Sequence, residues 1–368
     1  MTSGRDAGRA MRRDTAARRR GRAGGRRLAR GAAALAGALA AAAAPPAAAA
    51  QLEWSGRAFG TTWRVRAIDP PPEPSPEALG AEIEALLRTI DAQVSSWRAD
   101  SELSRFAAAD TTGWWPVSAD TARLVAAALA LHDRSDGAFD PTVAPLVALW
   151  GFGPAPRRRT PPSEAEIAAV RPRVGAARIA VRADPPALRK ARPDVALDLT
   201  ALTEGFAVDA IARRLGERGL ARHLVELGGE LRASGAGPGG APWRVGVERP
   251  DAPAGAAPAT PGWVVALHEA ALSTSGQHRQ FFAAGGKRYA HVLDPRRGRP
   301  VDHALVSVSV IAPEAVLADG WATALLVLGP EQGPRVAERE ALAALFVLER
   351  EGGLEVLATP GFARAQVR

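Results

Sequence analysis

The chain has 368 residues, of which 47% are hydrophobic and 23% charged, an ordinary composition for a globular protein with a sizeable core. It contains no cysteine, which excludes disulfides, thiolate chemistry and lipid attachment through an N-terminal cysteine. The net charge is +8, but residues 1–30 hold eleven Arg and two Asp, so this segment carries +9 and the rest of the chain about −1. The basic charge belongs to one end, and nucleic-acid binding by the folded part loses its support.

Residues 1–50 contain the three regions of an export signal in order. An Arg-rich stretch ends at Arg30, an uncharged run over residues 31–44 follows, and small residues precede Gln51. The apolar run is too short and too rich in alanine for a membrane span. The alternative to an export signal is a disordered basic tail. We expect an export signal peptide over residues 1–50 and one mature domain over residues 51–368, located in the periplasm without a stable membrane span.

The predicted elements after the leader alternate between helices and strands without the period of a parallel βαβ sheet. In the first half, the patterns predict a strand over 54–68 with a turn at 59–62, helices starting at Ser75 and Ser118, a capping box at Ser163 and Glu166, a buried strand over 195–199 and a helix over 203–217.

In the second half, the patterns predict strands over 223–227, 243–247, 263–267 and 304–311, a helix over 314–328, and hairpins across Gly285-Gly286 and Gly352-Gly353. Together these elements predict an α+β fold, with a single two-lobed domain whose antiparallel or mixed sheets are flanked by helices.

Two turns combine glycine with polar or aromatic residues. The segment 59–62 (Phe-Gly-Thr-Thr) is rich in hydrogen-bond donors, although such a turn commonly only ends a strand. Residues 136–143 place two acids around Gly137, Ala138 and Phe139. This segment is either a backbone cradle with aromatic walls for a planar ligand or a loop closed by its own acidic side chains.

Residues 198–205 join the predicted buried strand to a helix N-terminus. The unpaired N–H groups and the helix dipole make such a junction a natural anion site. Gly205 would let a ligand approach the backbone closely. Glu204 has an ordinary interpretation as well, since an acid near a helix start compensates the dipole.

Two further places offer chemistry. Asp319 and Thr323 are four residues apart on a predicted helix, which puts their Cβ atoms about 5–6 Å apart on one face. Carboxylate and hydroxyl oxygens suit Mg²⁺, although a hydrogen bond within the helix is the simpler interpretation. His291 lies on the second arm of a predicted hairpin with Asp294 nearby, and we regard it as a candidate acid or base.

In combination, these segments resemble the FAD:protein FMN transferase (ApbE-like) family, over about residues 59–333. The stretches that carry the resemblance stand in one order: 60–62, 95–104, 136–153, 198–209, 226–230, 274–276, 291–295 and 319–325. Eight separated blocks in one order are far more specific than any single glycine motif.

The resemblance implies a Mg²⁺-dependent transfer of FMN from FAD to a Thr or Ser hydroxyl of an acceptor flavoprotein, with release of AMP. It implies that His291 accepts the hydroxyl proton. It also implies that Mg²⁺ is held by Asp319, Thr323 and the backbone carbonyl of Ala201. The residues that it implies for the FAD site are Phe59, Trp97, Ala138, Phe139, Asp140, Asp198, Glu204 and Leu293.

Four positions depart from the commonest family pattern. Trp97 and Phe206 each stand where the family often has Tyr, and Glu230 replaces a frequent Asp. Glu204 stands where many members have Lys, which reverses a charge beside the expected FAD diphosphate.

Two other functions fit the same segments. A Mg²⁺-dependent FAD pyrophosphatase would use the same metal and diphosphate sites with water as the nucleophile. An exported protein that binds FAD without chemistry would not need Asp319, Thr323 or His291. A labelled acceptor protein would distinguish the transferase from the pyrophosphatase, and released AMP would distinguish it from the FAD-binding protein.

Overall fold

The computed structural model describes residues 50–154, 158–251, 261–277 and 280–367. The predicted export signal over residues 1–50 lies outside these ranges except for Ala50, and it stays a prediction. Within the described ranges, none of the helices combines the length and the apolar sequence that crossing a membrane requires.

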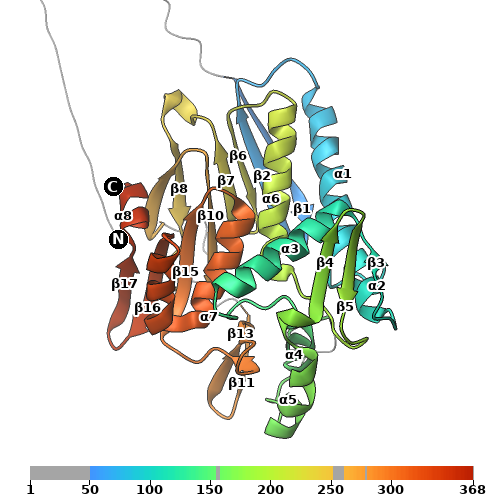
Figure 1. The fold of residues 1–368 in the computed structure, drawn as a ribbon. Coiled ribbons are helices and arrows are strands. Elements are labelled where there is room, and N and C mark those ends of the chain that lie inside the picture. Colours follow the sequence, from blue (N-terminus) through green and yellow to red (C-terminus); the bar gives the residue numbers. More distant parts are fainter. Residues whose placement is uncertain (1–49, 155–157, 252–260, 278–279, 368) are drawn as a thin grey trace, which may run out of the picture. The chain divides into compact units, whose positions relative to one another are not determined.

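An eight-stranded sheet organises the described residues, with the strand order β1-β2-β6-β7-β10-β15-β16-β17 (Figure 1). All its recorded pairings are antiparallel. Its strands are β1 (Gln51–Ala58), β2 (Thr61–Ile68), β6 (His223–Leu227), β7 (Glu230–Ser234), β10 (Ala270–Gly276), β15 (Leu305–Ala312), β16 (Ala343–Arg350) and β17 (Gly353–Ala358).

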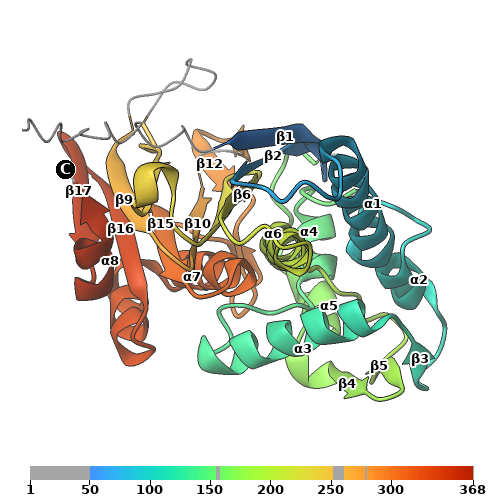
Figure 2. The same cartoon turned by 90° about the horizontal axis from the view of Figure 1, so that it is seen from above.

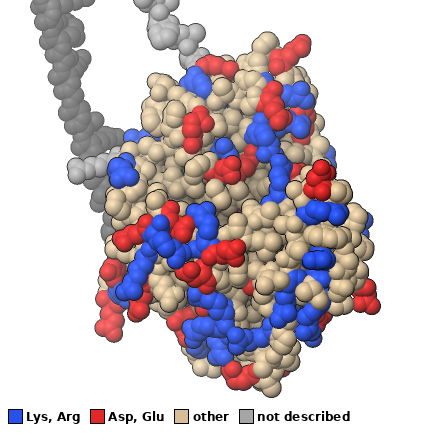
Figure 3. Space-filling view, viewed as in Figure 1, with Lys and Arg blue, Asp and Glu red and all other residues tan. Residues whose placement is uncertain are grey.

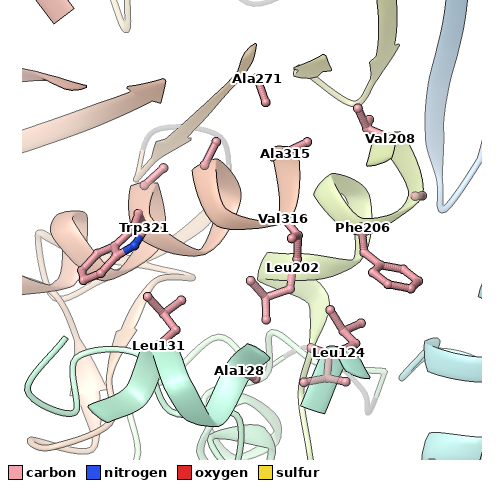
Figure 4. Close-up of a cluster of buried hydrophobic side chains, with 14 of the residues drawn as sticks. Leu124, Ala128, Leu131, Leu202, Phe206, Val208, Ala271, Ala315, Val316 and Trp321 are labelled. Carbon is pink, nitrogen blue, oxygen red and sulfur yellow. The ribbon is translucent and has the colours of Figure 1, made fainter. Parts of the chain in front are cut away.

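Helices α6 (Thr200–Glu217) and α7 (Ala315–Arg339) cover one face of this sheet (Figure 2). Helix α1 (Pro76–Val94) packs against α6, and α3 (Ala119–Arg134) packs against both α6 and α7. Figure 4 shows Leu131 and Ala128 of α3 close to side chains of α6 and α7. Apolar side chains of all four helices and of the sheet form one core, which packs α6 and α7 against each other.

The opposite face of the sheet carries a smaller layer. A three-stranded sheet of order β18-β9-β8 and helix α8 (Pro360–Ala365) share a second core with it, which includes Leu272, Trp243 and Phe362. The strands are β8 (Trp243–Val247), β9 (Trp263–Leu267) and β18 (Gln366–Val367). The large sheet is therefore covered on both faces, and the mixed helices and antiparallel sheets confirm the predicted α+β class.

The remaining α-helices and strands of the described residues are short. They are α2 (Glu102–Ala108), α4 (Ala144–Leu149), α5 (Glu164–Val170), the sheet of β3 (Trp115–Pro116), β4 (Ile179–Ala183) and β5 (Pro186–Lys190), and the pairs β11 (Phe281–Ala284) with β12 (Lys287–Ala290) and β13 (Leu293–Asp294) with β14 (Arg299–Pro300). Of these, α2 packs on α1, and β4 and β5 pack on α3. The β11–β12 hairpin stacks Phe282 and Tyr289 on each other and packs them near Trp150.

Predictions from local signals are confirmed. Ser75 and Ser118 each accept a hydrogen bond from the first turn of α1 and α3. Ser163 and Glu166 form the complete capping box of α5. The hairpins across Gly285-Gly286 and Gly352-Gly353 are also present.

Two predictions are wrong. The segment 195–199 is buried but is no strand, because Asp198 N–H bonds to the Pro141 carbonyl in a loop and not to a neighbouring strand. Helix α6 starts at Thr200 and not at residue 203, with a non-helical Ala201 in its first turn. The predicted helix over 314–328 is present and ends at a kink at Gly329, which takes φ 78°, and α7 then continues in a further helical segment that was not predicted.

Candidate functional site

A cavity of about 820 Å³ opens between the large sheet, the N-terminal part of α6 and helix α7. Each of the twelve residues that the sequence singled out lines it: Phe59, Trp97, Ala138, Phe139, Asp140, Asp198, Ala201, Glu204, His291, Leu293, Asp319 and Thr323. They come from segments up to 264 residues apart, which the fold brings to one place. Their individual roles remain a prediction.

Aromatic side chains form part of the wall. Phe59 is in the turn between β1 and β2, with φ 50°, and Phe139 is buried in the loop after α3. Trp97 lies in the loop between α1 and α2, and 64% of its surface is exposed although it lines the cavity. An exposed ring at a cavity mouth is suited to stacking on a planar ligand.

Two acids of the wall also hold the backbone in place. The Asp140 carboxylate accepts hydrogen bonds from the Thr142 N–H and hydroxyl, at 2.8 and 2.5 Å. Asp198 accepts the Thr200 N–H at 2.9 Å, at the start of α6. The loop over residues 136–143 is therefore closed by its own acid, as one interpretation expects, and it also lines the cavity. That it forms a cradle for a planar ligand stays a prediction.

The catalytic candidate His291 directly follows strand β12. Its N–H donates to the Gln280 carbonyl at 3.0 Å, and its ring Nδ1 lies 3.1 Å from the same oxygen. An Nδ1–H that donates to a carbonyl leaves the lone pair of the neutral ring on Nε2. Asp294, the expected neighbour, binds the Arg296 guanidinium.

Asp319 and Thr323 are on one face of α7, as their spacing predicts. The Asp319 carboxylate is buried and accepts the Gly205 N–H from α6 at 3.2 Å. The Thr323 hydroxyl lies 2.8 Å from the hydroxyl of Ser275 on β10. Carboxylate, hydroxyl and carbonyl oxygens are the donors that Mg²⁺ prefers.

Two further acids, Glu230 and Glu204, lie beside Asp319 of this pair. Glu230 on β7 is buried, accepts the Ser273 hydroxyl with one oxygen, and has no hydrogen-bond partner at Oε2 within the described part of the chain. Burial first, and then the charges of Asp319 and Glu204, raise the pKa of Glu230 well above its ordinary value. Burial and the charge of Glu204 likewise raise the pKa of Asp319 well above its ordinary value.

The charge balance of these acids fits a cation. Their raised pKa values mean that ionised oxygens are unfavourable here without positive charge nearby. In the described ranges, no group of three or more His, Cys, Asp or Glu side chains has the geometry of a metal site. The expected set is of another kind, because it has one carboxylate, one hydroxyl and one backbone carbonyl, and Mg²⁺ commonly keeps waters and phosphate oxygens as its other ligands.

Residues outside the predicted set also line the cavity, among them Glu230, Ser275 and Gln280. The sequence signals for β7 and β10 are weak, because Glu230, Ser273 and Thr274 are polar residues within strands. Polar residues in the middle strands of a sheet covered on both faces could have indicated the site, since such strands are normally apolar.

Comparisons with known proteins agree on one family. A model of the ApbE family matches residues 59–346. The FAD:protein FMN transferase of Klebsiella pneumoniae (strain 342) is 40% identical over 309 residues, 83% of this chain and 87% of that protein. The protein of the same name from Salmonella typhimurium is 39% identical over the same shares.

Solved structures agree as well. The flavin transferase ApbE from Vibrio cholerae has a TM-score of 0.77 at 34% identity, and the match covers 86% of this chain and 99% of that one. The apo form of the Pseudomonas stutzeri flavinyl transferase ApbE has a TM-score of 0.79 at 37% identity, over 88% of this chain and 98% of that one.

Proposed function

Because the chain belongs to the ApbE family and is an FAD:protein FMN transferase, we propose that it moves FMN from FAD to a threonine or serine hydroxyl of an acceptor flavoprotein, with Mg²⁺ and with release of AMP. The cavity described above is the site of this reaction. The observation that carries the proposal is the meeting of His291, Asp319 and Thr323 on one cavity with aromatic walls.

FAD occupies the cavity in this proposal. Its planar rings contact the aromatic residues Phe59, Trp97 and Phe139, which line the cavity. Its diphosphate lies near the start of α6, where the helix dipole favours negative charge. Glu204 in this turn is an acid whose charge raises the pKa of Asp319, so a cation held by Asp319 would have to offset the charge of Glu204 as well.

The Asp319 carboxylate, the Thr323 hydroxyl and the Ala201 carbonyl would hold Mg²⁺. When bound, the ion supplies positive charge that stabilises the diphosphate oxygens as the bond between the two phosphates breaks. The Gly205 N–H keeps the Asp319 carboxylate oriented, and the Ser275 hydroxyl does the same for Thr323. These contacts fit a site that is ordered before the ion binds.

The proton is handled by His291. The acceptor Oγ attacks the FMN-side phosphorus, and its proton passes to Nε2 of His291 while the bond from that phosphorus to the AMP oxygen breaks. The Gln280 carbonyl at Nδ1 selects the tautomer that this step needs. The products are AMP and an acceptor that carries FMN through a phosphoester bond.

The test is one incubation of the purified protein with FAD, Mg²⁺ and an acceptor flavoprotein domain. AMP is quantified, and the acceptor is examined for flavin fluorescence after denaturing electrophoresis. Asp319→Ala should lower both signals about 100-fold or more, since metal charge stabilisation contributes several kcal/mol. Asp194→Ala is the control, because Asp194 is exposed and pairs with Arg192 outside the cavity.

The outcomes separate the three functions. Labelled acceptor with an equal amount of AMP supports the transferase. AMP without labelled acceptor, from several acceptor domains, would favour the pyrophosphatase. Bound FAD with neither product would leave a binding protein.

The leader supports a proposal about location. We propose export to the periplasm, because residues 1–50 have the basic, apolar and small-residue regions of a signal peptide. The acceptor flavoprotein would then expose its hydroxyl in the same compartment. N-terminal sequencing of the protein from a periplasmic extract checks this, and an intact Met1 there would contradict it.

A further inference from the structure

Helix α7 begins without a cap of its own. The helices α1, α2, α3 and α5 each start at a serine whose hydroxyl accepts an N–H of the first turn. The residue in this position of α7 is Glu314, and its side chain makes no such bond. The free N–H groups at the start of a helix need acceptors when they are buried, so another residue has to supply them.

Asp209 of α6 supplies them. Its two carboxylate oxygens each accept one backbone N–H, from Ala315 and from Val316, both at 2.9 Å. The side chain is buried, and the Arg232 guanidinium of β7 pairs with it. A carboxylate placed between a helix N-terminus and a guanidinium is compensated on both sides, which explains why this charge is tolerated in the core.

The same face of α6 contacts α7 at a second point. Gly205 is one helical turn before Asp209, and a Cβ added to it would lie 2.5 Å from the Ala315 carbonyl oxygen. The Gly205 N–H bonds to the Asp319 carboxylate. Helix α6 thus holds the first turn of α7 at two positions, and Asp319 is in the next turn.

This arrangement matters because the expected Mg²⁺ ligands come from both helices. Ala201 belongs to α6, whereas Asp319 and Thr323 belong to α7. The distance between the two parts of the site is therefore set by how the helices are joined. We infer that Asp209 is a positioning residue, which fixes the start of α7 on α6 and so keeps Asp319 and Thr323 at the right distance from the Ala201 carbonyl.

The inference rests on the proposed metal site, and metal binding tests it directly. Mn²⁺ is titrated into the full chain with FAD present and no acceptor, and free Mn²⁺ is followed by electron paramagnetic resonance. Asp209→Asn keeps the shape but can accept only one of the two N–H groups. Loss of such an outer contact commonly weakens metal binding about 10- to 100-fold, and we expect a loss in this range with an unchanged circular dichroism spectrum.

Glu102→Ala is the matched control. Glu102 of α2 accepts the Ser118 N–H and the Thr121 hydroxyl, so it holds the start of α3 from another helix in a similar way. Helix α3 carries none of the expected ligands. This variant should lose stability and keep the wild-type affinity for Mn²⁺.

A rescue variant separates positioning from simple capping. In Asp209→Ala/Glu314→Ser, the new serine can cap α7 locally, so the melting temperature should recover relative to Asp209→Ala while Mn²⁺ binding stays weak. Recovery of both would overturn the positioning role. Wild-type affinity in Asp209→Asn would overturn it as well. A wild-type protein that fails to bind Mn²⁺ would instead contradict the proposed metal site.

Discussion

The imidazole of His291 has its orientation set by the backbone. Both its N–H and its ring Nδ1 contact the Gln280 carbonyl, and its ring lies edge-on to Phe152 at 6.4 Å. These contacts hold the ring at the cavity wall with Nε2 as the basic nitrogen. In the proposed reaction, a base fixed in this way would take the proton of the incoming hydroxyl without rearranging.

His291→Gln should therefore slow the transfer and leave FAD binding intact. We expect the rate constant at saturating FAD to fall about 10²- to 10⁴-fold, the usual contribution of a positioned acid or base. Single-turnover labelling of the acceptor measures the rate, and quenching of flavin fluorescence measures FAD binding. His268→Gln is the control, because His268 is exposed and does not line the cavity. A wild-type rate in His291→Gln would assign the proton transfer to another group.

The close contact between α6 and α7 depends on Gly205, which has no side chain. Gly205 is buried in the middle of a helix, where glycine costs about 0.5–1 kcal/mol relative to alanine. The nearest atoms to an added Cβ are backbone atoms of Ala315 and Val316, which cannot move aside without separating the helices. The close approach explains the glycine.

Two substitutions in α6 should consequently have opposite signs. Gly205→Ala should lower the free energy of unfolding by about 1–3 kcal/mol, as overpacking does. Gly216→Ala, in the same helix with no atom within 4 Å of the added Cβ, should raise it by up to about 1 kcal/mol. Urea unfolding curves compare the two. Equal effects would show that the helices do not meet closely at Gly205.

Elements with strong local signals could be predicted from the sequence. The serine caps of α1, α3 and α5 and the two glycine hairpins depend on residues close in the chain. The segment 195–199 misled the prediction because its alternating buried residues are typical of a strand, whereas its backbone bonds to a loop. Such a partner is distant in sequence, and no local pattern reveals it.

The candidate site could likewise be predicted where the signal was local, and not where it depends on contacts between distant residues. The spacing of Asp319 and Thr323 predicted their shared face of α7, and the order of the blocks predicted which residues line the cavity. The cap that Asp209 places on α7 could not be predicted, because it joins residues 106 and 107 positions apart. Glu230, which is buried, was also not predicted as a site residue, because the local sequence around an acid normally indicates an exposed position.

Charge is distributed differently over the leader and the described residues. Basic side chains dominate residues 1–30. Figure 3 shows acidic and basic groups mixed over one face of the described part, which agrees with its small net charge. The unusual electrostatics lie inside, where Glu204, Glu230 and Asp319 meet beside the cavity. Stability of the metal-free protein should therefore depend on pH through these buried acids.

The direction in which stability changes with pH follows from proton linkage. Burial and neighbouring acids raise the pKa of Glu230 and of Asp319 in the folded state, so the folded protein keeps protons that the unfolded chain releases. Stability from these groups is fully present below the unfolded values of 4.5 and 3.8, and it is lost as the pH rises through the folded values. Near neutral pH, folding of the metal-free protein has to bury these acids either ionised or at the cost of binding protons.

Glu230→Gln should remove part of the free-energy cost of burying these acids near neutral pH. In the presence of a chelator at pH 7.5, we expect its free energy of unfolding to exceed that of the wild type by about 1–3 kcal/mol, the usual cost of a buried polar group without a full set of partners. The difference should shrink towards zero near pH 4, where the wild-type carboxyl is protonated. Glu355→Gln is the control, because Glu355 is exposed and pairs with Arg350 on the surface. Saturating Mg²⁺ with FAD should also reduce this difference in the free energy of unfolding, because the cation would compensate the Glu230 charge that the variant removes. A variant less stable than the wild type at pH 7.5 would show that the ionised Glu230 is already compensated within the protein.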